Sequence, residues 1–310
     1  MAWAMFQQVL WSSITVSTFY VLLAVAFSLY LKITKVWNFA QAGLFAVGYT
    51  CLYFGHRIYL LPAWASIVVA AIVVVVLSLA IEHWGYRILR KRRSPQLVYF
   101  ILSFMVAEFL IYFVTMVIGT EPQALVPSLF TPSTPMFGIR VTRWDFEALL
   151  TTAVLLTATL VFVSRTSLGR KMVAVADNAS LAELFRIKPE RIYLVTAAFS
   201  AVLIVFACWL FGTRSVAVPA TSLDLIFVAV ISCILGGVGS IGGAAVAAVL
   251  LSILRGFSIF IVPSIWQNAL IYYGLVVVIV FFPQGIRVSR SWISGLALPG
   301  SHARFESSSK

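Results

Sequence analysis

The stretch SRTSLGRKMVAVADNASLAELFRIKPER, residues 164–191, is the longest strongly polar interruption in the second half of an otherwise apolar chain. Ser167 is placed to cap a first helix, and Asp177 or Asn178 to cap a second. Pro189 suits the first turn of the helix that follows, where its missing N–H costs nothing. A simple loop between two spans could be much shorter. The stretch therefore predicts two short helices outside the membrane.

The second of these helices carries an apolar stripe. Leu181, Leu184 and Phe185 are spaced i, i+3, i+4 and so share one helix face. Ser180 and Glu183 match a capping box at its start. Two interpretations are open: a connector whose stripe rests on its own protein or on lipid headgroups, and a docking element for a partner at the cytoplasmic face.

The composition of the whole chain is that of a membrane protein. Of its 310 residues, 62% are hydrophobic and 10% are charged, and its mean hydropathy is +1.03. Soluble domains carry about a quarter charged residues, so we expect an all-α polytopic membrane protein. The net charge of +12 is distributed between apolar spans. Positive-inside topology explains this pattern better than nucleic-acid binding does.

About eight membrane-spanning segments are predicted. The basic run of residues 87–93 and the stretch 164–191 mark the inside, which places the N-terminus outside and the C-terminus in the cytoplasm. The proline-containing residues 119–145 are expected outside, with little regular structure. Residues 1–290 are predicted to form a single transmembrane domain, followed by a polar cytoplasmic tail, residues 291–310. The predicted spans are residues 5–31, 36–55, 60–81, 97–118, 146–163, 192–211, a broken segment centred on 236–243, and 265–282.

The broken segment is predicted from a glycine run, Gly236–Gly243, with five glycines in eight residues. Each glycine costs a helix about 1 kcal/mol relative to alanine. The apolar halves on either side of the run are each about fourteen residues long, which is too short for one half to cross the membrane alone without tilt. If two half-length helices meet at a break, the last span runs from outside to inside and the basic tail lies inside, whereas a single crossing would place the tail outside. The alternative is one continuous helix that uses its glycines for close packing.

Polar residues inside the predicted spans point to transport. Asn38 and Gln41, three apart, are expected to share a face of an unusually polar second span, which also contains Gly43. Glu108 lies near the middle of the fourth span, where a carboxylate is costly. It is expected either to line a path or to pair with a neighbouring helix. Backbone groups freed at a glycine break must likewise face protein or a water-filled cavity.

The sequence contains no motif that indicates an enzyme or a metal site. It contains no P-loop, so the chain itself is not expected to hydrolyse ATP in that way. Ser240 follows Gly239, but no histidine lies in a later apolar span to serve as its base. Neither the three cysteines nor the three histidines have metal-ligand spacing. No cofactor and no metal site are expected.

Four motifs, in order, resemble the branched-chain amino acid ABC transporter permeases, a family that includes urea and short-amide permeases. Residues 37–43, WNFAQAG, resemble the family's NFA(H/Q)G signature. Residues 169–187 resemble its cytoplasmic coupling loop, Gly236–Gly243 its GG(I/V)GS-x-x-G run, and residues 282–285 its terminal PQG. The resemblance spans nearly the whole chain.

The resemblance implies a subunit of a bacterial inner-membrane importer. Its partners would be a second, related permease subunit, two cytoplasmic ATP-binding subunits and a periplasmic solute-binding protein. The coupling positions it implies are Gly169, Ala174, Asp177, Asn178, Ala182, Leu184, Phe185 and Ile187. The substrate path we predict from the polar residues and the break comprises Asn38, Gln41, Gly43, Glu108, Gly236, Gly237, Gly239 and Ser240.

Three departures from the family's pattern are present. Ala42 and Gly43 replace a frequent glycine and acid, Phe185 and Arg186 replace a small residue or glycine before residue 187, and Gly242 replaces a common proline. The first departure lies close to the predicted path and leaves the solute open. The alternative function is a stand-alone secondary transporter or channel, which would carry out transport without an ATPase.

Overall fold

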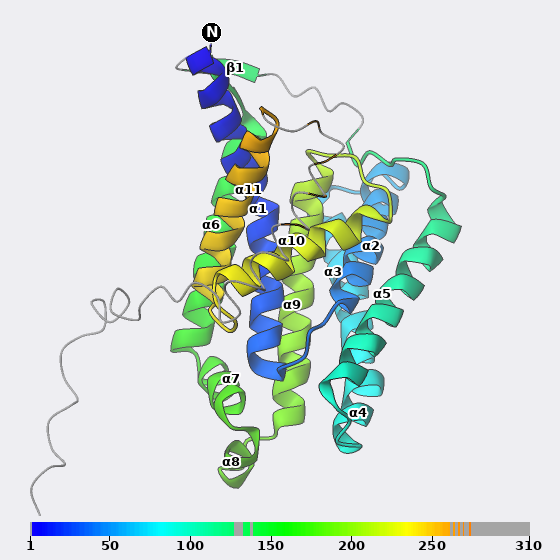
Figure 1. The fold of residues 1–310 in the computed structure, drawn as a ribbon. Coiled ribbons are helices and arrows are strands. Elements are labelled where there is room, and N and C mark those ends of the chain that lie inside the picture. Colours follow the sequence, from blue (N-terminus) through cyan, green and yellow to red (C-terminus); the bar gives the residue numbers. More distant parts are fainter. Residues whose placement is uncertain are drawn as a thin grey trace, which may run out of the picture.

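The structure of the chain is a computed structural model that describes residues 2–126, 133–136 and 139–260, together with Pro263, Trp266, Ala269 and Tyr273. In these residues the chain is a bundle of α-helices with one small β-hairpin (Figure 1). The prediction of an all-α membrane protein is confirmed in this coarse form. The helices are α1 Ala2–Thr34, α2 Ala40–Leu52, α3 Ala63–Ala80, α4 Arg87–Lys91, α5 Gln96–Ile118, α6 Arg143–Arg165, α7 Ser167–Asp177, α8 Ala179–Leu184, α9 Pro189–Gly212, α10 Thr221–Leu235 and α11 Ile241–Ser258.

Six helical segments of this part of the chain are long and apolar enough to cross a membrane. The count of eight predicted spans stays a prediction. The predicted second span, residues 36–55, is not among the six segments. The last predicted span, residues 265–282, lies almost entirely outside the described residues. The six segments are Met5–Thr34, Ala63–Lys91, Gln96–Ile118, Arg143–Arg165, Pro189–Gly212 and Ile241–Ser258.

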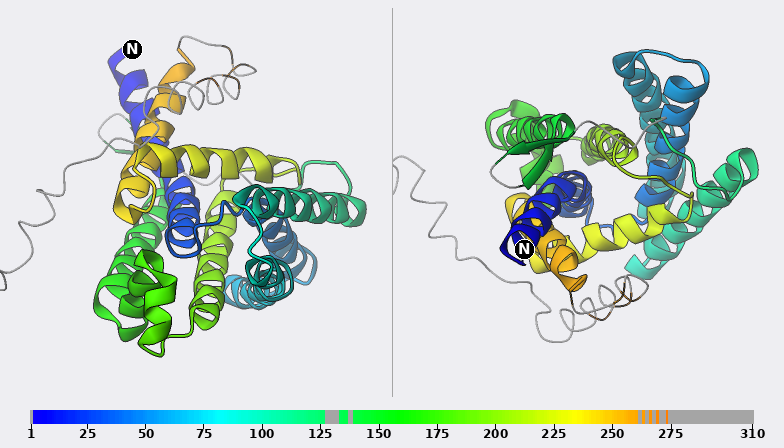
Figure 2. Two further views of the ribbon diagram at one scale, coloured as in Figure 1. Left: turned by 60° about the horizontal axis from the view of Figure 1, so that its bottom comes forward. Right: turned by 90° about the horizontal axis from the view of Figure 1, so that it is seen from above.

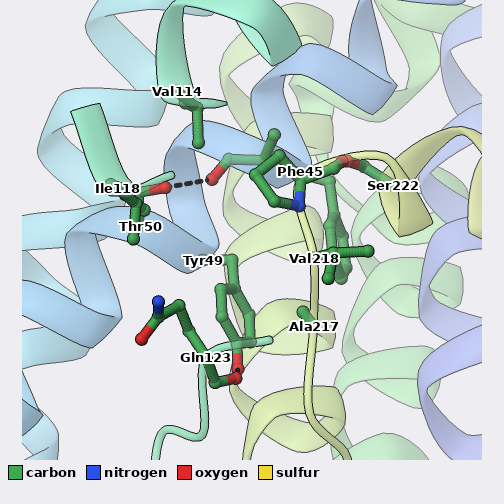
Figure 3. A pocket seen from close by; sticks show the side chains of 11 residues that line it. Phe45, Tyr49, Thr50, Val114, Ile118, Gln123, Ala217, Val218 and Ser222 are labelled. Atoms are coloured by element: carbon green, nitrogen blue, oxygen red, sulfur yellow. Dashed lines mark hydrogen bonds between the residues drawn. The ribbon is translucent and has the colours of Figure 1, made fainter. Parts of the chain in front are cut away.

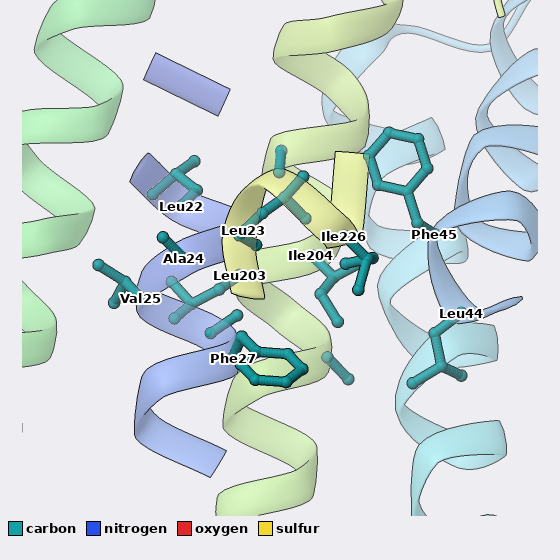
Figure 4. Close-up of a cluster of buried hydrophobic side chains, with 14 of the residues drawn as sticks. Leu22, Leu23, Ala24, Val25, Phe27, Leu44, Phe45, Leu203, Ile204 and Ile226 are labelled. Carbon is teal, nitrogen blue, oxygen red and sulfur yellow. The ribbon is translucent and has the colours of Figure 1, made fainter. Parts of the chain in front are cut away.

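Helix α1 is the centre of the bundle. It packs against α6, α9, α10 and α11, and nearly all of its apolar length is buried. A helix that is hydrophobic all round belongs inside a bundle rather than at its surface. Figure 4 shows side chains of α1, α9 and α10, among them Leu23, Leu203 and Ile226, in one buried cluster, which Phe45 of α2 joins from the side of α10.

Helices α3, α5 and α6 form the periphery. Fewer than a third of the residues in their apolar windows are buried, and they expose large apolar side chains such as Val76, Phe109 and Leu150. A continuous apolar surface of this extent is incompatible with water and matches a lipid environment. The exposed faces of these three helices are thus the lipid-facing side of the bundle.

Small residues bring α11 against α1. The Ser252 hydroxyl donates a hydrogen bond of 2.8 Å to the carbonyl of Ser13, and a Cβ on Gly256 would lie only 1.8 Å from the Ser13 hydroxyl oxygen. Serine and glycine let two membrane helices approach closely and bond through their backbones. This contact explains why a small residue, Ser13, lies at this point of α1.

Helix α10 lies across the bundle, between the pair formed by α1 and α11 and the pair formed by α2 and α5 (Figure 2). At its end the chain turns sharply, and α11 then runs alongside α1 toward the N-terminus (Figure 1). Helices α4, α7 and α8 all lie at the end of the molecule opposite the N-terminus, with α4 apart from the other two (Figure 1).

Two connecting segments differ in part from the prediction. Residues 119–145 have more regular structure than expected, because they contain a hairpin of β1, Ser133–Met136, and β2, Ile139–Thr142, whose strands pair antiparallel. Helix α3 ends at Ala80, close to the predicted end of its span, but the chain stays helical through a π-helical segment, Ile81–Tyr86, directly into α4. The basic run thus begins on the extension of a membrane helix, and this brings its side chains back against the bundle.

Candidate functional site

Asn38 and Gln41 are both buried at the start of α2. Asn38 precedes the helix instead of lying on it, and its Oδ1 accepts a hydrogen bond of 2.7 Å from the Tyr86 hydroxyl. Gln41 is 1% exposed, and in the described part of the chain neither its Oε1 nor its Nε2 has a hydrogen-bond partner. A buried amide without partners is costly, so Gln41 is the polar group on α2 that is most in need of a ligand or a bound water.

Gly43 permits the contact between α2 and α5. A Cβ at this position would lie 2.8 Å from Leu110 Cβ and 3.1 Å from the Ala107 carbonyl oxygen. Helix packing therefore explains why this chain has glycine, and not an acidic residue, at position 43. An acidic side chain could not fit between these two helices without displacing α5.

Glu108 is half-buried on α5, between buried Ala107 and Phe109, which is 69% exposed. No hydrogen bond or ion pair joins it to another described residue. The helix therefore turns Glu108 toward the edge of its packed face. Its predicted place in a substrate path remains a prediction.

One buried carboxylate that the sequence analysis missed is Glu82. It is 2% exposed in the segment between α3 and α4, accepts a hydrogen bond of 2.5 Å from the Tyr30 hydroxyl, and forms an ion pair with Arg90. The Arg90 guanidinium also lies 4.2 Å from the centre of the Tyr193 ring on α9. The eight-residue spacing of Glu82 and Arg90 could have revealed the pair, had the basic run been read as helix, because residues two turns apart share a face.

Glu82→Gln should destabilise the chain by about 3 kcal/mol, because it leaves the largely buried Arg90 without its anionic partner. The measurement is thermal unfolding of the purified chain in detergent. Glu147→Gln is the matched control. Glu147 pairs with Arg143 on the exposed surface of α6, so its loss should cost no more than about 0.5 kcal/mol. Equal melting temperatures for the two variants would contradict a structural role for the buried pair.

The glycine run forms a tight turn between α10 and α11. Gly237 and Gly239 have positive φ angles of +90° and +89°, which glycine adopts without steric cost. Ser240 caps α11, and its Oγ accepts a hydrogen bond of 3.1 Å from the Gly243 N–H. A Cβ on Gly236 would lie 2.2 Å from the carbonyl carbon of Gly243, so the backbones at the two ends of the run touch.

The lengths of the two helices differ from the expected pair of half-spans. Helix α10 has 15 residues, about 22 Å at 1.5 Å per residue, which is short of a hydrocarbon core about 30 Å thick. Helix α11 has 18 residues and is itself long enough to be a candidate span. A discontinuous membrane segment thus remains a prediction.

A small apolar pocket lies at the C-terminal ends of α2 and α5 (Figure 3). The Tyr49 hydroxyl donates a hydrogen bond of 2.6 Å to the Gln123 carbonyl, and Gln123 and Ala217 exchange backbone hydrogen bonds of 2.9 and 3.1 Å. The cavity that remains is about 10 Å³, no more than a single water needs. The space between α2 and the start of α10 is therefore closed at this end.

The polar stretch 164–191 folds as the two predicted short helices, with the cap expected at Asn178 confirmed and the cap expected at Ser167 wrong. Thr166, not Ser167, caps α7, and its Oγ1 accepts a hydrogen bond of 2.9 Å from the Gly169 N–H. Asn178 caps α8 by accepting one of 3.0 Å from the Leu181 N–H, so the expected capping box at Ser180 is wrong. Gly169 lies so close to the α6 backbone that its Cβ would be 2.2 Å from the Phe162 carbonyl oxygen.

The coupling positions divide between an inner and an outer face. Ala182 is buried and Ile187 is half-buried against the main core, while Ala174, also half-buried, accepts a hydrogen bond of 3.1 Å from the Asn178 N–H. Asp177 and Asn178 are exposed. The apolar stripe of α8 faces away from the protein: Leu181 is 52% exposed, Leu184 80% and Phe185 73%.

Arg186 ends α8 in a conformation that glycine prefers. Its φ is +60°, and the Arg186 and Ile187 N–H groups bond to the Glu183 and Ala182 carbonyls at 2.9 and 3.1 Å. This is the double hydrogen bond of a Schellman motif, in which the left-handed residue is usually glycine. Arg186, which replaces a small residue at this position, therefore strains the C-cap of α8 and also adds a positive charge.

Arg186→Gly should stabilise the end of α8 by about 0.5–1 kcal/mol, because a left-handed conformation strains any residue with a Cβ. The readout is amide hydrogen exchange of residues 179–187. Arg186→Ala removes the same charge but keeps a Cβ, so it should bring no gain in protection. An equal gain in protection over the wild type in both variants would show that charge, not backbone strain, governs this cap.

Comparison with known proteins identifies relatives along nearly the whole chain. A profile of the family described as "Branched-chain amino acid transport system / permease component" matches residues 9–280. The branched-chain amino acid permease protein LivH of Salmonella typhimurium is 24% identical over 295 residues, covering 91% of this chain and 95% of LivH. BraD of Pseudomonas aeruginosa is 24% identical over 290 residues, covering 90% and 94%.

A more distant match is the xylose transport system permease protein XylH of Escherichia coli, 31% identical over 135 residues, which cover 40% of this chain and 34% of XylH. In the solved structure of PsaBC from Streptococcus pneumoniae in complex with Fab, one chain is 11% identical, with a TM-score of 0.49 and coverage of 88% of this chain and 90% of that one. The family match extends from α1 to beyond α11 and includes the glycine turn and both short helices. The chain belongs to the family of branched-chain amino acid transport system permease components, which are transport proteins and not enzymes.

Proposed function

We propose that the chain is the membrane-embedded permease subunit of a bacterial ABC importer, which moves a branched-chain amino acid or a related small polar solute inward. The observation that carries the proposal is the exposed apolar face of α8. Leu181, Leu184 and Phe185 lie outside the candidate spans, at the end of the molecule that also holds the basic helix α4. Apolar groups exposed on a short helix in water call for a partner that covers them.

The partner that fits is a cytoplasmic ATP-binding subunit. This chain has no P-loop of its own, so ATP-driven transport must receive its force from another protein. Two such subunits, a second related permease subunit and a periplasmic solute-binding protein complete the importer. In this arrangement α4, α7 and α8 face the cytoplasm and the N-terminus faces the periplasm, as the basic residues favour.

The proposed substrate path runs past the start of α2 and the glycine turn. Gln41 offers a buried amide without partners, Asn38 lies three residues before it, and the turn from Gly236 to Ser240 has the irregular backbone typical of transporter binding segments. Glu108 would enter the path only where α5 meets the second permease subunit. The outer closure at Tyr49 and Gln123 fits one state of an alternating-access cycle.

The first test is purification of the tagged chain from its native host in mild detergent. A P-loop ATPase should co-purify in comparable amount. Transport by the chain alone, with no ATPase present, would instead support a stand-alone transporter. Competition uptake into vesicles that contain the reconstituted complex, with leucine, urea, short amides and xylose as competitors, then identifies the solute.

A further inference from the structure

We propose that a basic pocket where α4 meets the start of α9 binds the phosphate group of an anionic phospholipid. The pocket has a volume of about 180 Å³, far more than a single water needs. Its charged lining consists of Arg87 and Arg90 on α4, Arg191 and Glu190 on α9, and Glu82. Its place in the fold is separate from α8 and from the glycine turn.

The charges of this lining do not balance. Arg90 pairs with Glu82, and Arg87 pairs with Glu190 at 2.7 Å. Arg191 forms no ion pair with any described residue, which leaves one guanidinium in excess. His83, which also lines the pocket, approaches Arg87 at 3.4 Å and adds no negative charge. The pocket therefore carries a net positive charge that an anion would neutralise.

Several hydrogen-bond donors of the lining are also unused. Arg87 Nε, Arg90 Nε and Arg90 Nη1 are buried and have no acceptor among the described residues. Leaving buried guanidinium donors unsatisfied is costly. The arginines that line the pocket are clustered, and phosphate is the group that offers clustered arginines several anionic oxygens in a small volume.

The level of the pocket in the membrane points to a lipid as the source of that phosphate. Trp84, one residue from His83, is 71% exposed, and Ile88 on the next turn is 46% exposed. Exposed tryptophan beside a basic run is typical of the headgroup region. Basic pockets between membrane helices at the cytoplasmic side fit anionic headgroups. Inorganic phosphate has the same chemistry and is the second source to be tested.

The test uses the delipidated full chain with the subunits that co-purify with it. Bound lipid is counted by native mass spectrometry during titration with phosphatidylglycerol, with phosphatidylcholine, or with inorganic phosphate. We expect phosphatidylglycerol to bind more tightly than phosphatidylcholine, because choline places a cation against the arginines. Arg191→Gln should weaken phosphatidylglycerol binding about tenfold, since it removes a charge-assisted hydrogen bond.

Three further variants make the result specific. Arg191→Lys should restore most of the affinity, Arg87→Gln should lower it as Arg191→Gln does, and Arg165→Gln, at an exposed position on α6, should leave it unchanged. Arg191 is exposed, so its substitution is not expected to unfold the chain. Binding of inorganic phosphate by the wild-type chain that is lost in Arg191→Gln would support the phosphate site and assign it to the free ion. Wild-type phosphatidylglycerol binding by both glutamine variants of the pocket, or displacement of the lipid by leucine, would overturn the proposal.

Discussion

Gly236→Ala is expected to disrupt the turn between α10 and α11 and to abolish solute uptake. The added Cβ would lie 2.2 Å from the Gly243 carbonyl carbon and 2.4 Å from the Ala244 nitrogen. Both are backbone atoms, so neither can move aside as a flexible side chain would. The two helices must separate, at an expected cost of at least about 3 kcal/mol. Thermal unfolding in detergent and uptake by the reconstituted complex are the two measurements.

Gly242→Ala is the matched control within the same turn. A Cβ at Gly242 meets nothing within 4 Å, and the residue lies in the first turn of α11. Alanine should be tolerated there, with a gain of up to about 1 kcal/mol from higher helix propensity. If the Gly236 and Gly242 variants proved equally stable, the close backbone contact between the ends of the run would be wrong. A Gly236 variant that is unstable yet transports normally would separate the fold of the turn from transport.

Leu184→Glu combined with Phe185→Glu is expected to release the co-purifying ATPase and stop uptake while the chain stays folded. Both side chains are largely exposed, so the change should barely affect the melting temperature of the isolated chain. At an interface each apolar side chain contributes about 1.5–3 kcal/mol, so the loss of both should weaken the complex at least about a hundredfold. The readout is the ratio of ATPase to permease after purification.

The control for this release is Arg165→Gln combined with Lys171→Gln. It changes the net charge by the same two units, at exposed positions outside α8, and leaves the apolar stripe intact. The ATPase should remain bound. Retention of the ATPase by the Leu184 and Phe185 variant would refute the docking assignment, whereas family membership, which rests on the whole chain, would stand.

The stretch 164–191 shows which structural features can be predicted from neighbouring residues. Two short helices, the cap at Asn178 and Pro189 at the start of α9 follow from residues within one helical turn of each other, and all were predictable. The exposure of Leu184 and Phe185 was open, since an amphipathic stripe faces either its own protein or a partner. The positive φ of Arg186 was also beyond prediction, because glycine is the usual signal for that conformation.

The sequence by itself determined that this chain is an α-helical membrane protein and that the glycine run interrupts its helices, because hydropathy, charge and glycine content act over neighbouring residues. Only the tertiary structure decided which polar residues are buried together. Glu82 is buried against Tyr30, 52 residues away, whereas Glu108 stays at the edge of α5. Gly236 touches Gly243 only because the turn folds back. Such contacts depend on how whole helices pack against one another, and no local pattern in the chain records that packing.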